Sequence, residues 1–277
     1  MLVNYIKQFK DIYKNEVLEV GGKGAALGEL YNGGLPVPPG FVITANAFRE
    51  FAEKGILGEL GKEIFEAFDQ LETNRVAVRS SAIAEDSNSA SWAGQLESYL
   101  NVSKDNLIEN IQNCWESIET DRALDYADSQ NTNKADLVVA VVVQQMVAAE
   151  VAGVMFTINP VSKNDDEVII EACFGLGELL VQGMITPDDY LINKNSLEII
   201  SKELGSQTEM LVFKDGRNQE VPVPEDLISE FVLTDSQLEE LVELGKKIES
   251  HYNSPQDIEW AREKGKFYIV QSRPITA

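Results

Sequence analysis

The sequence predicts an α+β protein of two interdependent lobes, roughly residues 1–140 and 141–277. The chain has 277 residues, of which 44% are hydrophobic, enough for one large domain or two closely packed lobes. Helical and strand patterns alternate along the whole chain, and strands are more frequent in its second half. No linker-like segment separates the halves, so we expect a ligand cleft between lobes that depend on each other.

The first half contains a helical pattern, a short strand and two further helical patterns around a buried strand. The segment after Asp105 is amphipathic, because Ile108, Ile111, Trp115 and Ile118 share one stripe at helical spacing. The expected elements are a glycine-rich loop entering a helix at 22–33, a Pro-braced strand at 41–44, a helix at 45–70, a strand at 76–78 and a helix at 105–126.

The second half is predicted to be rich in strands. The run 137–143 is continuous and β-branched, which is typical of a strand covered on both faces. Thr234 and Gln237 form a plausible capping box at the start of a helix. The expected elements are strands at 137–143, 151–157, 168–171 and 190–192, a glycine-rich helical turn at 175–183, a helix at 234–252 and a hairpin at 257–273 that turns near Gly265.

Charge and composition exclude several classes of function. The chain carries 46 acidic and 23 basic residues, a net charge of −23, which argues against broad binding to nucleic acid or anionic membrane. The run 137–143 is far shorter than the roughly 20 apolar residues that span a bilayer, and no signal-peptide pattern is present. Cys114 and Cys173 fit buried free thiols, so we expect a cytoplasmic protein.

A single histidine limits the chemistry further. His251 lies between a helical pattern and a Pro-containing loop, where a surface position is expected. One histidine excludes His-rich zinc sites and weakens Ser-His or Cys-His catalysis. Anion binding and acid–base chemistry must therefore come from lysine, arginine and carboxylates.

Lys23 is the first candidate ligand of a phosphate. It stands among glycines at the expected start of a helix, where backbone N–H groups and a mobile positive charge suit an anion. The segment is not a Walker A loop, since Gly24 follows Lys23 where Ser or Thr is required. The alternative is a glycine-rich turn with a surface lysine.

Arg79 and Arg122 are two further candidate cations. Arg79 is expected to leave a buried strand directly into a Ser-rich loop, where a guanidinium can meet an anion or pair with Glu85 or Asp86. Arg122 lies on or beside the apolar stripe of its helix. A charge there either pairs internally or points into a cleft.

The hairpin supplies candidate metal ligands. Asp257 and Glu259 share one strand face, as do Gln271 and Arg273, because side chains alternate along a strand. Pairing across the turn brings these strand ends together. Carboxylate and amide oxygens suit Mg²⁺, which usually takes one or two protein ligands plus phosphate oxygens. The alternative is a solvated polar face.

Eight ordered segments together carry a family resemblance. They are GGKGAALGEL, GLPVPPGFVIT, VAVRSSAIAEDSNSASWAGQLESYLNV, TDRALDY, VVVQQMVAAEVAGVMFTINP, IIEACFGLGELLVQG, DIEW and YIVQSRPIT. In this order they resemble the N-terminal ATP-grasp domain of phosphoenolpyruvate synthase (pyruvate, water dikinase) and pyruvate, phosphate dikinase, and a similar domain occurs in rifampin phosphotransferase. The resemblance covers nearly the whole chain and implies an α+β ATP-grasp fold.

The resemblance also implies roles for individual residues. The positions matching residues that hold the ATP phosphates are Lys23, Arg79 and Arg122. Those expected at the base and the nucleotide pocket are Gln145, Val147 and Glu171. Glu259 and Gln271 match Mg²⁺ ligands that also contact ATP, and the residues expected to be catalytic are Arg79, Arg122, Asp257 and Arg273.

The resemblance further implies a partner. Family enzymes move a pyrophosphoryl group from Mg-ATP to a histidine on a swivelling domain, release AMP, and reach a small acceptor such as pyruvate only through that histidine. No segment here resembles the swivelling or acceptor domain. We therefore expect the ATP half of a dikinase, a separate subunit or an excised domain, that performs only a partial reaction.

Two other functions stay open. One is an ATP-grasp kinase that phosphorylates a small molecule directly. The other is a nucleotide-binding regulatory module without turnover, against which the complete set of charged candidates argues. The nucleotide product, AMP or ADP, distinguishes transfer to a partner histidine from direct phosphorylation of a small molecule.

Overall fold

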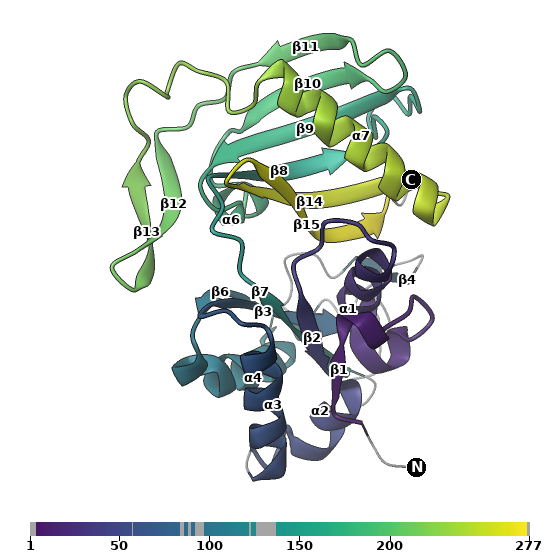
Figure 1. Cartoon of the computed structure of the whole chain (residues 1–277), viewed down its shortest axis with the longest axis vertical. Helices are drawn as coiled ribbons and strands as arrows, with labels where there is room; N and C mark the ends of the chain where they lie inside the picture. The colour runs from purple at the N-terminus through teal and green to yellow at the C-terminus, as the bar shows by residue number, and fades with distance from the viewer. Residues whose placement is uncertain are drawn as a thin grey trace. The chain divides into compact units, whose positions relative to one another are not determined.

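The computed structural model describes residues 4–56, 58–83, 86–87, 90–91, 97–121, 123–125 and 137–275. Its contacts divide the chain into two compact units, Met1–Met146 and Val147–Ala277 (Figure 1). The division falls just after strand β7 (Val139–Gln145), which belongs to the first sheet. From the sequence we expected the boundary between the lobes near residue 140, which lies inside that strand. Both units combine helices and strands, so the predicted α+β class is confirmed.

The first unit is built on a five-stranded antiparallel sheet in the order β1-β2-β7-β3-β6. The strands other than β7 are β1 (Ile6–Gln8), β2 (Gly40–Ile43), β3 (Val76–Ala82) and β6 (Ser98–Val102), with a separate pair β4 (Asp86–Ser87) and β5 (Ala90–Ser91). The central strand β7 is almost wholly buried, as its run of β-branched residues predicts.

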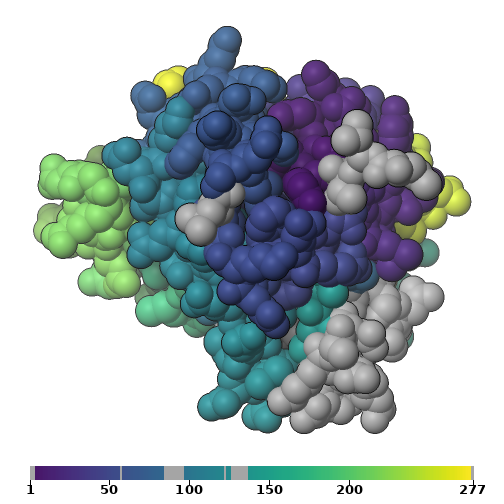
Figure 2. Space-filling view, turned by 90° about the horizontal axis from the view of Figure 1, so that it is seen from below, coloured from purple at the N-terminus to yellow at the C-terminus, as the bar shows by residue number. Residues whose placement is uncertain are grey.

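Helices cover both faces of this sheet. They are α1 (Val17–Asn32), α2 (Ala45–Phe51), α3 (Glu59–Gln70) and α4 (Leu107–Glu116), with 3-10 turns η1 (Phe9–Asp11), η2 (Lys104–Asn106) and η3 (Ser117–Glu119). Ile64 of α3 and Ile111 of α4 share a core with Val78 of β3. Gly24 of α1 instead packs on Val42, whose side chain lies on the other face. Figure 2 shows residues around α3, in dark blue, at the surface of this unit.

Two helix predictions for the first unit are wrong in extent. The helix expected at 45–70 is divided into α2 and α3, because Gly55 and Gly58 between them adopt φ values of 76° and 65°. The helix expected at 105–126 is α-helical over α4, continues as η3 and is interrupted at Thr120, after which residues 121 and 123–125 are helical again. Its predicted end lies outside the described residues.

The second unit is built on a six-stranded antiparallel sheet in the order β11-β10-β9-β8-β14-β15. Its strands are β8 (Val151–Phe156), β9 (Glu167–Phe174), β10 (Asp188–Asn193), β11 (Ile199–Glu203), β14 (Gln256–Glu263) and β15 (Lys266–Pro274). A short helix, α6 (Glu178–Val181), follows β9, and helix α7 (Asp235–Tyr252) begins at the predicted Thr234 capping box. None of the helices in the described part of the chain has the length and apolarity needed to cross a membrane.

Helix α7 covers one face of this sheet (Figure 1). A side chain at Gly245 of α7 would strike Met155, which pairs with Ile258 on the helix-facing side. Because side chains alternate, the opposite face carries Asp257 and Glu259. We call this opposite face, which bears Glu171, Asp189, Asp257 and Glu259, the carboxylate face.

A second hairpin projects from the sheet of this unit (Figure 1). It consists of β12 (Glu209–Lys214) and β13 (Arg217–Pro222), joined at Asp215 and Gly216, which both adopt positive φ. Leu211 of β12 forms a bridge to Gly175, just after the end of β9. The sequence did not predict this hairpin or β11.

Candidate functional site

Lys23 lies in the first turn of a helix segment that begins after a sharp kink. Gly21 adopts φ 71° and ψ 173° inside α1, and a Cβ there would lie 2.2 Å from the Ser81 Oγ. The Ser81 hydroxyl accepts a hydrogen bond from the Gly24 N–H at 3.1 Å and donates one to the Val20 carbonyl at 3.0 Å. The kink therefore docks on β3 and fixes a helix start with Lys23 in its first turn, an arrangement suited to anions.

Arg79 lies within β3 and not in a loop, which corrects the prediction. The strand continues to Ala82, and Arg79 pairs with Val142 on one side and Ser98 on the other. Its side chain shares a face with Ser81, two residues away, the face on which α1 docks. Only 9% of Arg79 is exposed. Helix α1, which bears Lys23, thus covers the same sheet face as this buried guanidinium.

The structure does not bring Gln145 to that face. Gln145 pairs with Val76 at the end of β7, so alternation turns its side chain toward the α3 and α4 side. Its backbone N–H donates to the Pro39 carbonyl at 2.8 Å. Arg122 lies outside the described residues, so its expected place in the site stays a prediction. The side chains of Glu85 and Asp86 also lie outside them, so the alternative pairing of Arg79 is untested.

Five predicted residues of the second unit share the carboxylate face. Cross-strand pairing places Glu171 opposite Val154, Val154 opposite Glu259, and Glu259 opposite Gln271. Asp257 and Arg273 form the next row of the same face. Directly paired residues have Cα atoms about 5 Å apart, so these side chains are neighbours.

Asp257 and Arg273 form an ion pair. The Arg273 Nε donates to the Asp257 Oδ2 at 2.8 Å, and the terminal Nη2 lies 2.7 Å from the same oxygen. Burial still raises the pKa of Asp257 above its ordinary value, because Arg273 offsets the burial only in part and the charge of Glu259 opposes ionisation. The pair orients a guanidinium on the carboxylate face.

Glu259 and Gln271 are the residues suited to a metal. They are direct cross-strand partners, and Gln271 is 6% exposed, so its amide is held in place by the sheet. A carboxylate and an amide oxygen on adjacent strands fit Mg²⁺, which keeps its remaining positions for phosphate oxygens and water. Among the residues described, no three His, Cys, Asp or Glu side chains are grouped to hold a metal ion.

Asp189 belongs to this face and was missed in the sequence. It pairs with Glu171 on one side and Glu203 on the other. Burial raises the pKa of Asp189, and the charge of Glu203 adds to this increase. The pKa of Glu171 is raised by burial and by the charges of Asp189 and Asp257. The alternation in PDDYLIN could have indicated that Asp188 and Asp189 face opposite ways. Carboxylates held against their own repulsion are typical of functional sites.

Val147 belongs to an apolar cluster that includes Ala261 of β14, the strand that bears Glu259. It is 6% exposed and packs with Ala152 and Ala261 in a small cluster that Val270 partly covers. Ala261 lies two residues from Glu259, on the same face. A small apolar cluster beside polar side chains is an environment that suits a base next to its phosphates.

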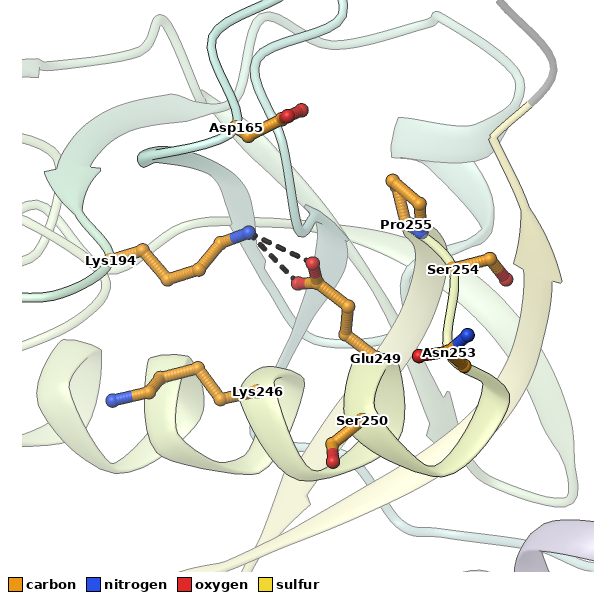
Figure 3. Close-up of a pocket in the computed structure, with 8 residues that line it drawn as sticks. All are labelled: Asp165, Lys194, Lys246, Glu249, Ser250, Asn253, Ser254 and Pro255. Carbon is orange, nitrogen blue, oxygen red and sulfur yellow. Dashed lines mark hydrogen bonds and ion pairs between the residues drawn. The ribbon is translucent and has the colours of Figure 1, made fainter.

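A separate pocket lies on the α7 side of this unit. Its volume is about 440 Å³, and its lining residues are Asp165, Lys194, Lys246, Glu249, Ser250, Asn253, Ser254 and Pro255 (Figure 3). Lys194 Nζ lies 2.9 Å and 3.1 Å from the two Glu249 oxygens, and Lys246 points away from them toward Glu243. Lys194 and Glu249 thus pair with each other, Lys246 pairs with a residue outside the lining, and none of the predicted site residues lines the pocket.

The helix start at Lys23, the buried Arg79 and the carboxylate and amide side chains of the carboxylate face are groups typical of a nucleotide-binding protein of the α+β class. The family described as pyruvate phosphate dikinase, AMP/ATP-binding domain, matches residues 17–74 and 56–277. The chain belongs to this family.

Several curated relatives match almost the whole chain. A probable phosphoenolpyruvate synthase of Archaeoglobus fulgidus is 44% identical over 96% of this chain and 41% of its own length. A probable phosphoenolpyruvate synthase of Methanocaldococcus jannaschii is 40% identical over 99% of this chain and 27% of its own length. The phosphoenolpyruvate synthase of Pyrococcus furiosus is 38% identical over the full chain and 44% of its own length. This chain therefore spans less than half of each of these relatives.

Solved structures show a more distant likeness. The match with the D-alanine–D-alanine ligase of Bacillus anthracis covers 92% of this chain and 60% of the ligase, with 11% identity and a TM-score of 0.39. The match with the phosphoribosylglycinamide synthetase of Anaerococcus prevotii covers 88% of this chain and 40% of the synthetase, with 12% identity and a TM-score of 0.31.

Proposed function

We propose that this chain binds one Mg-ATP and transfers a pyrophosphoryl group from it to a histidine on a separate domain or subunit. The observation that carries the proposal is the pair of adjacent rows on β14 and β15, Asp257–Arg273 and Glu259–Gln271. They combine oxygen ligands for a cation with an oriented guanidinium, the two requirements of phosphoryl transfer. The length of the phosphoenolpyruvate synthase relatives supports a partner that supplies the histidine.

In this proposal each candidate has a distinct task. Lys23, Arg79 and Arg122 bind the phosphates, Glu259 and Gln271 hold Mg²⁺, and the base lies near Gln145, Val147 and Glu171. A bound Mg²⁺ would neutralise charge on the phosphate oxygens. Arg273, oriented by Asp257, stabilises the negative charge of the group in transfer.

The proposed first half-reaction is a displacement at phosphorus. A neutral imidazole nitrogen of the partner attacks the β-phosphorus of ATP, the N–P bond forms, and the bond from that phosphorus to the bridging oxygen of AMP breaks. AMP leaves with the bridging oxygen, and the imidazolium loses its proton. Water or inorganic phosphate then takes the terminal phosphoryl group of the pyrophosphohistidine, which leaves phosphohistidine. The small-molecule acceptor, pyruvate in the proposed case, is phosphorylated only from that partner phosphohistidine.

His251 does not supply this histidine in the proposal. It is exposed in the last turn of α7, and its ring contacts that of Tyr252 at a centroid distance of 5.2 Å.

Cys114 and Cys173 are buried free thiols, as predicted, and burial raises the pKa of each to about 12. Two buried free thiols of this kind support a reducing, cytoplasmic location.

The test separates three functions. The chain is incubated with Mg-ATP, with and without a swivelling domain of the family, and the nucleotides are separated by chromatography. Release of AMP only with the added domain supports the proposal. ADP formed with a small acceptor and no added domain supports a direct kinase, and binding without any product supports a regulatory module.

A further inference from the structure

Asp188, the first residue of β10, has a buried carboxylate that joins three segments of the second unit. The residue is 1% exposed. Its Oδ2 accepts hydrogen bonds from the Tyr190 hydroxyl at 3.0 Å and the Val232 N–H at 2.7 Å. Its Oδ1 accepts from the Gly205 N–H at 2.8 Å and the Gln207 Nε2 at 3.2 Å. Four donors thus compensate the buried charge without a cation.

Gln207 extends this network to the end of β9. The residue is 3% exposed, and its Nε2 also donates to the Ala172 carbonyl at 3.1 Å. Its Oε1 accepts from the Phe174 N–H at 3.1 Å. Strand β10 begins at Asp188, opposite Ala172, so the Phe174 N–H lies beyond the β9–β10 ladder. The Gln207 side chain takes the place of the missing strand partner.

The network lies where β9 becomes a glycine turn. Gly175 adopts φ 74°, and a Cβ there would lie 2.3 Å from the Leu211 carbonyl oxygen. That oxygen accepts a hydrogen bond from the Leu176 N–H at 2.9 Å. The Gly175 N–H also donates to the Glu150 carbonyl at 2.8 Å. Glycines have no side chains to fix their position, so the turn is held by backbone bonds to Glu150 and to β12, and by the bond from Gln207 to the preceding residue, Phe174.

The carboxylate face depends on the same network. Asp188 and Asp189 are consecutive on β10 and point to opposite faces. Asp189 pairs with Glu171, three residues before Phe174 on β9. A shift of the first residue of β10, or of the end of β9, therefore displaces both carboxylates of this pair.

We infer that Asp188 and Gln207 are positioning residues for the nucleotide: together they fix the end of β9 and the Gly175–Gly177 turn against β12, and so hold Glu171 and Asp189 in their binding arrangement. The inference rests on the proposed function, that this chain binds Mg-ATP through the carboxylate face. Neither residue contacts the ligand, because both lie on the buried side.

The test compares Gln207 with Gln219, a glutamine of the neighbouring hairpin formed by β12 and β13. Gln207→Met keeps the volume and removes all three side-chain hydrogen bonds. Gln219→Met is the matched control, because the Gln219 Nε2 bonds only the Lys214 carbonyl, at 2.6 Å, within the exposed hairpin. Mg-ATP affinity is measured by titration, and amide hydrogen exchange is measured residue by residue without nucleotide, both well below the melting temperature.

Gln207→Met is expected to raise the Kd for Mg-ATP about tenfold and to speed exchange at Phe174 and Leu176 about tenfold, with β3 unchanged. Gln219→Met should match the parent in both. If Gln207→Met does not fold, Asp188→Asn replaces it with the same expected direction, because it keeps the shape of the side chain and exchanges one acceptor oxygen for an NH2 group. A parental Kd in the folded variant, or faster exchange throughout the unit, overturns the inference. Failure of the parent to bind Mg-ATP contradicts the proposed function instead, and the exchange measurement still tests the network.

Discussion

Glu259 and Gln271 lie directly opposite each other on β14 and β15, one row from the Asp257–Arg273 ion pair. The same hairpin turns its other face, with Ile258 and Trp260, into the core under α7. The core therefore fixes the two rows to each other. This link between packing and the position of charged groups underlies the first three predictions.

Glu259→Gln should raise the Mg²⁺ concentration needed for half-maximal turnover about tenfold or more, because the amide removes the charge that attracts the ion. Affinity for the adenine nucleotide without metal should change little. Glu240→Gln, an exposed change on α7, is the control. Turnover titrated with Mg²⁺ checks this, and an unchanged metal dependence would remove Glu259 from the metal site.

Arg273→Met should destabilise the protein by about 1–3 kcal/mol near pH 8, because it leaves the Asp257 carboxylate largely buried without its cation. The loss of Arg273 raises the pKa of Asp257 further, so the folded variant binds a proton more tightly than the unfolded chain. Its stability deficit is then largest above that pKa and shrinks as the pH falls through it. Urea unfolding from pH 8 to pH 5 measures this, and a pH-independent deficit would contradict it.

Glu171→Gln should stabilise the protein at pH 8 without Mg²⁺ or nucleotide. Burial and two neighbouring carboxylates raise the pKa of Glu171 in the folded state, so its charge opposes folding above that pKa and the opposition ends as the pH falls below the unfolded value. The gain is about 1 kcal/mol or less after solvent screening, or about 2–4 °C in Tm. Thermal melts at pH 8 and pH 4 test the sign. A destabilised variant at pH 8 is the contrary result.

Lys23→Ala should weaken ATP binding about tenfold with little change in Tm, because Lys23 is half-buried in the first turn of a helix segment whose backbone is fixed by Ser81. Lys62→Ala, an exposed lysine of α3, is the matched control. Arg79 needs the milder change Arg79→Lys, since it is buried within β3. Isothermal titration at fixed Mg²⁺ is the measurement, and parental affinity in Lys23→Ala excludes its phosphate role.

Local patterns predicted much of the fold. The β-branched run at 137–143 identified the central strand β7, and Thr234 with Gln237 located the start of α7. The Asp215–Gly216 pair is a hairpin signal, yet β12 and β13 were missed because their exposed strands lack a clear apolar alternation. Helix breaks at Gly55 and Gly58 depend on backbone conformations that the residue type allows but does not require.

The candidate site was predictable where strand alternation alone decides it. Asp257 with Glu259, and Gln271 with Arg273, share a face as the sequence indicated. Arg79 was placed in a loop because the small polar residues after it resemble one, whereas Ser80 and Ser81 are buried in β3 and bonded to α4 and α1. Asp189 could not be assigned, because its role depends on which strand pairs with β9, a long-range property.

The most direct test of the account is the first half-reaction with a family swivelling domain supplied in trans. We predict AMP release and acid-labile, base-stable phosphate on the added domain, with His251→Asn reacting like the parent. Pyruvate alone, without that domain, should give no phosphoenolpyruvate. Stable phosphate on His251, or pyruvate turnover by this chain without the added domain, would contradict the account.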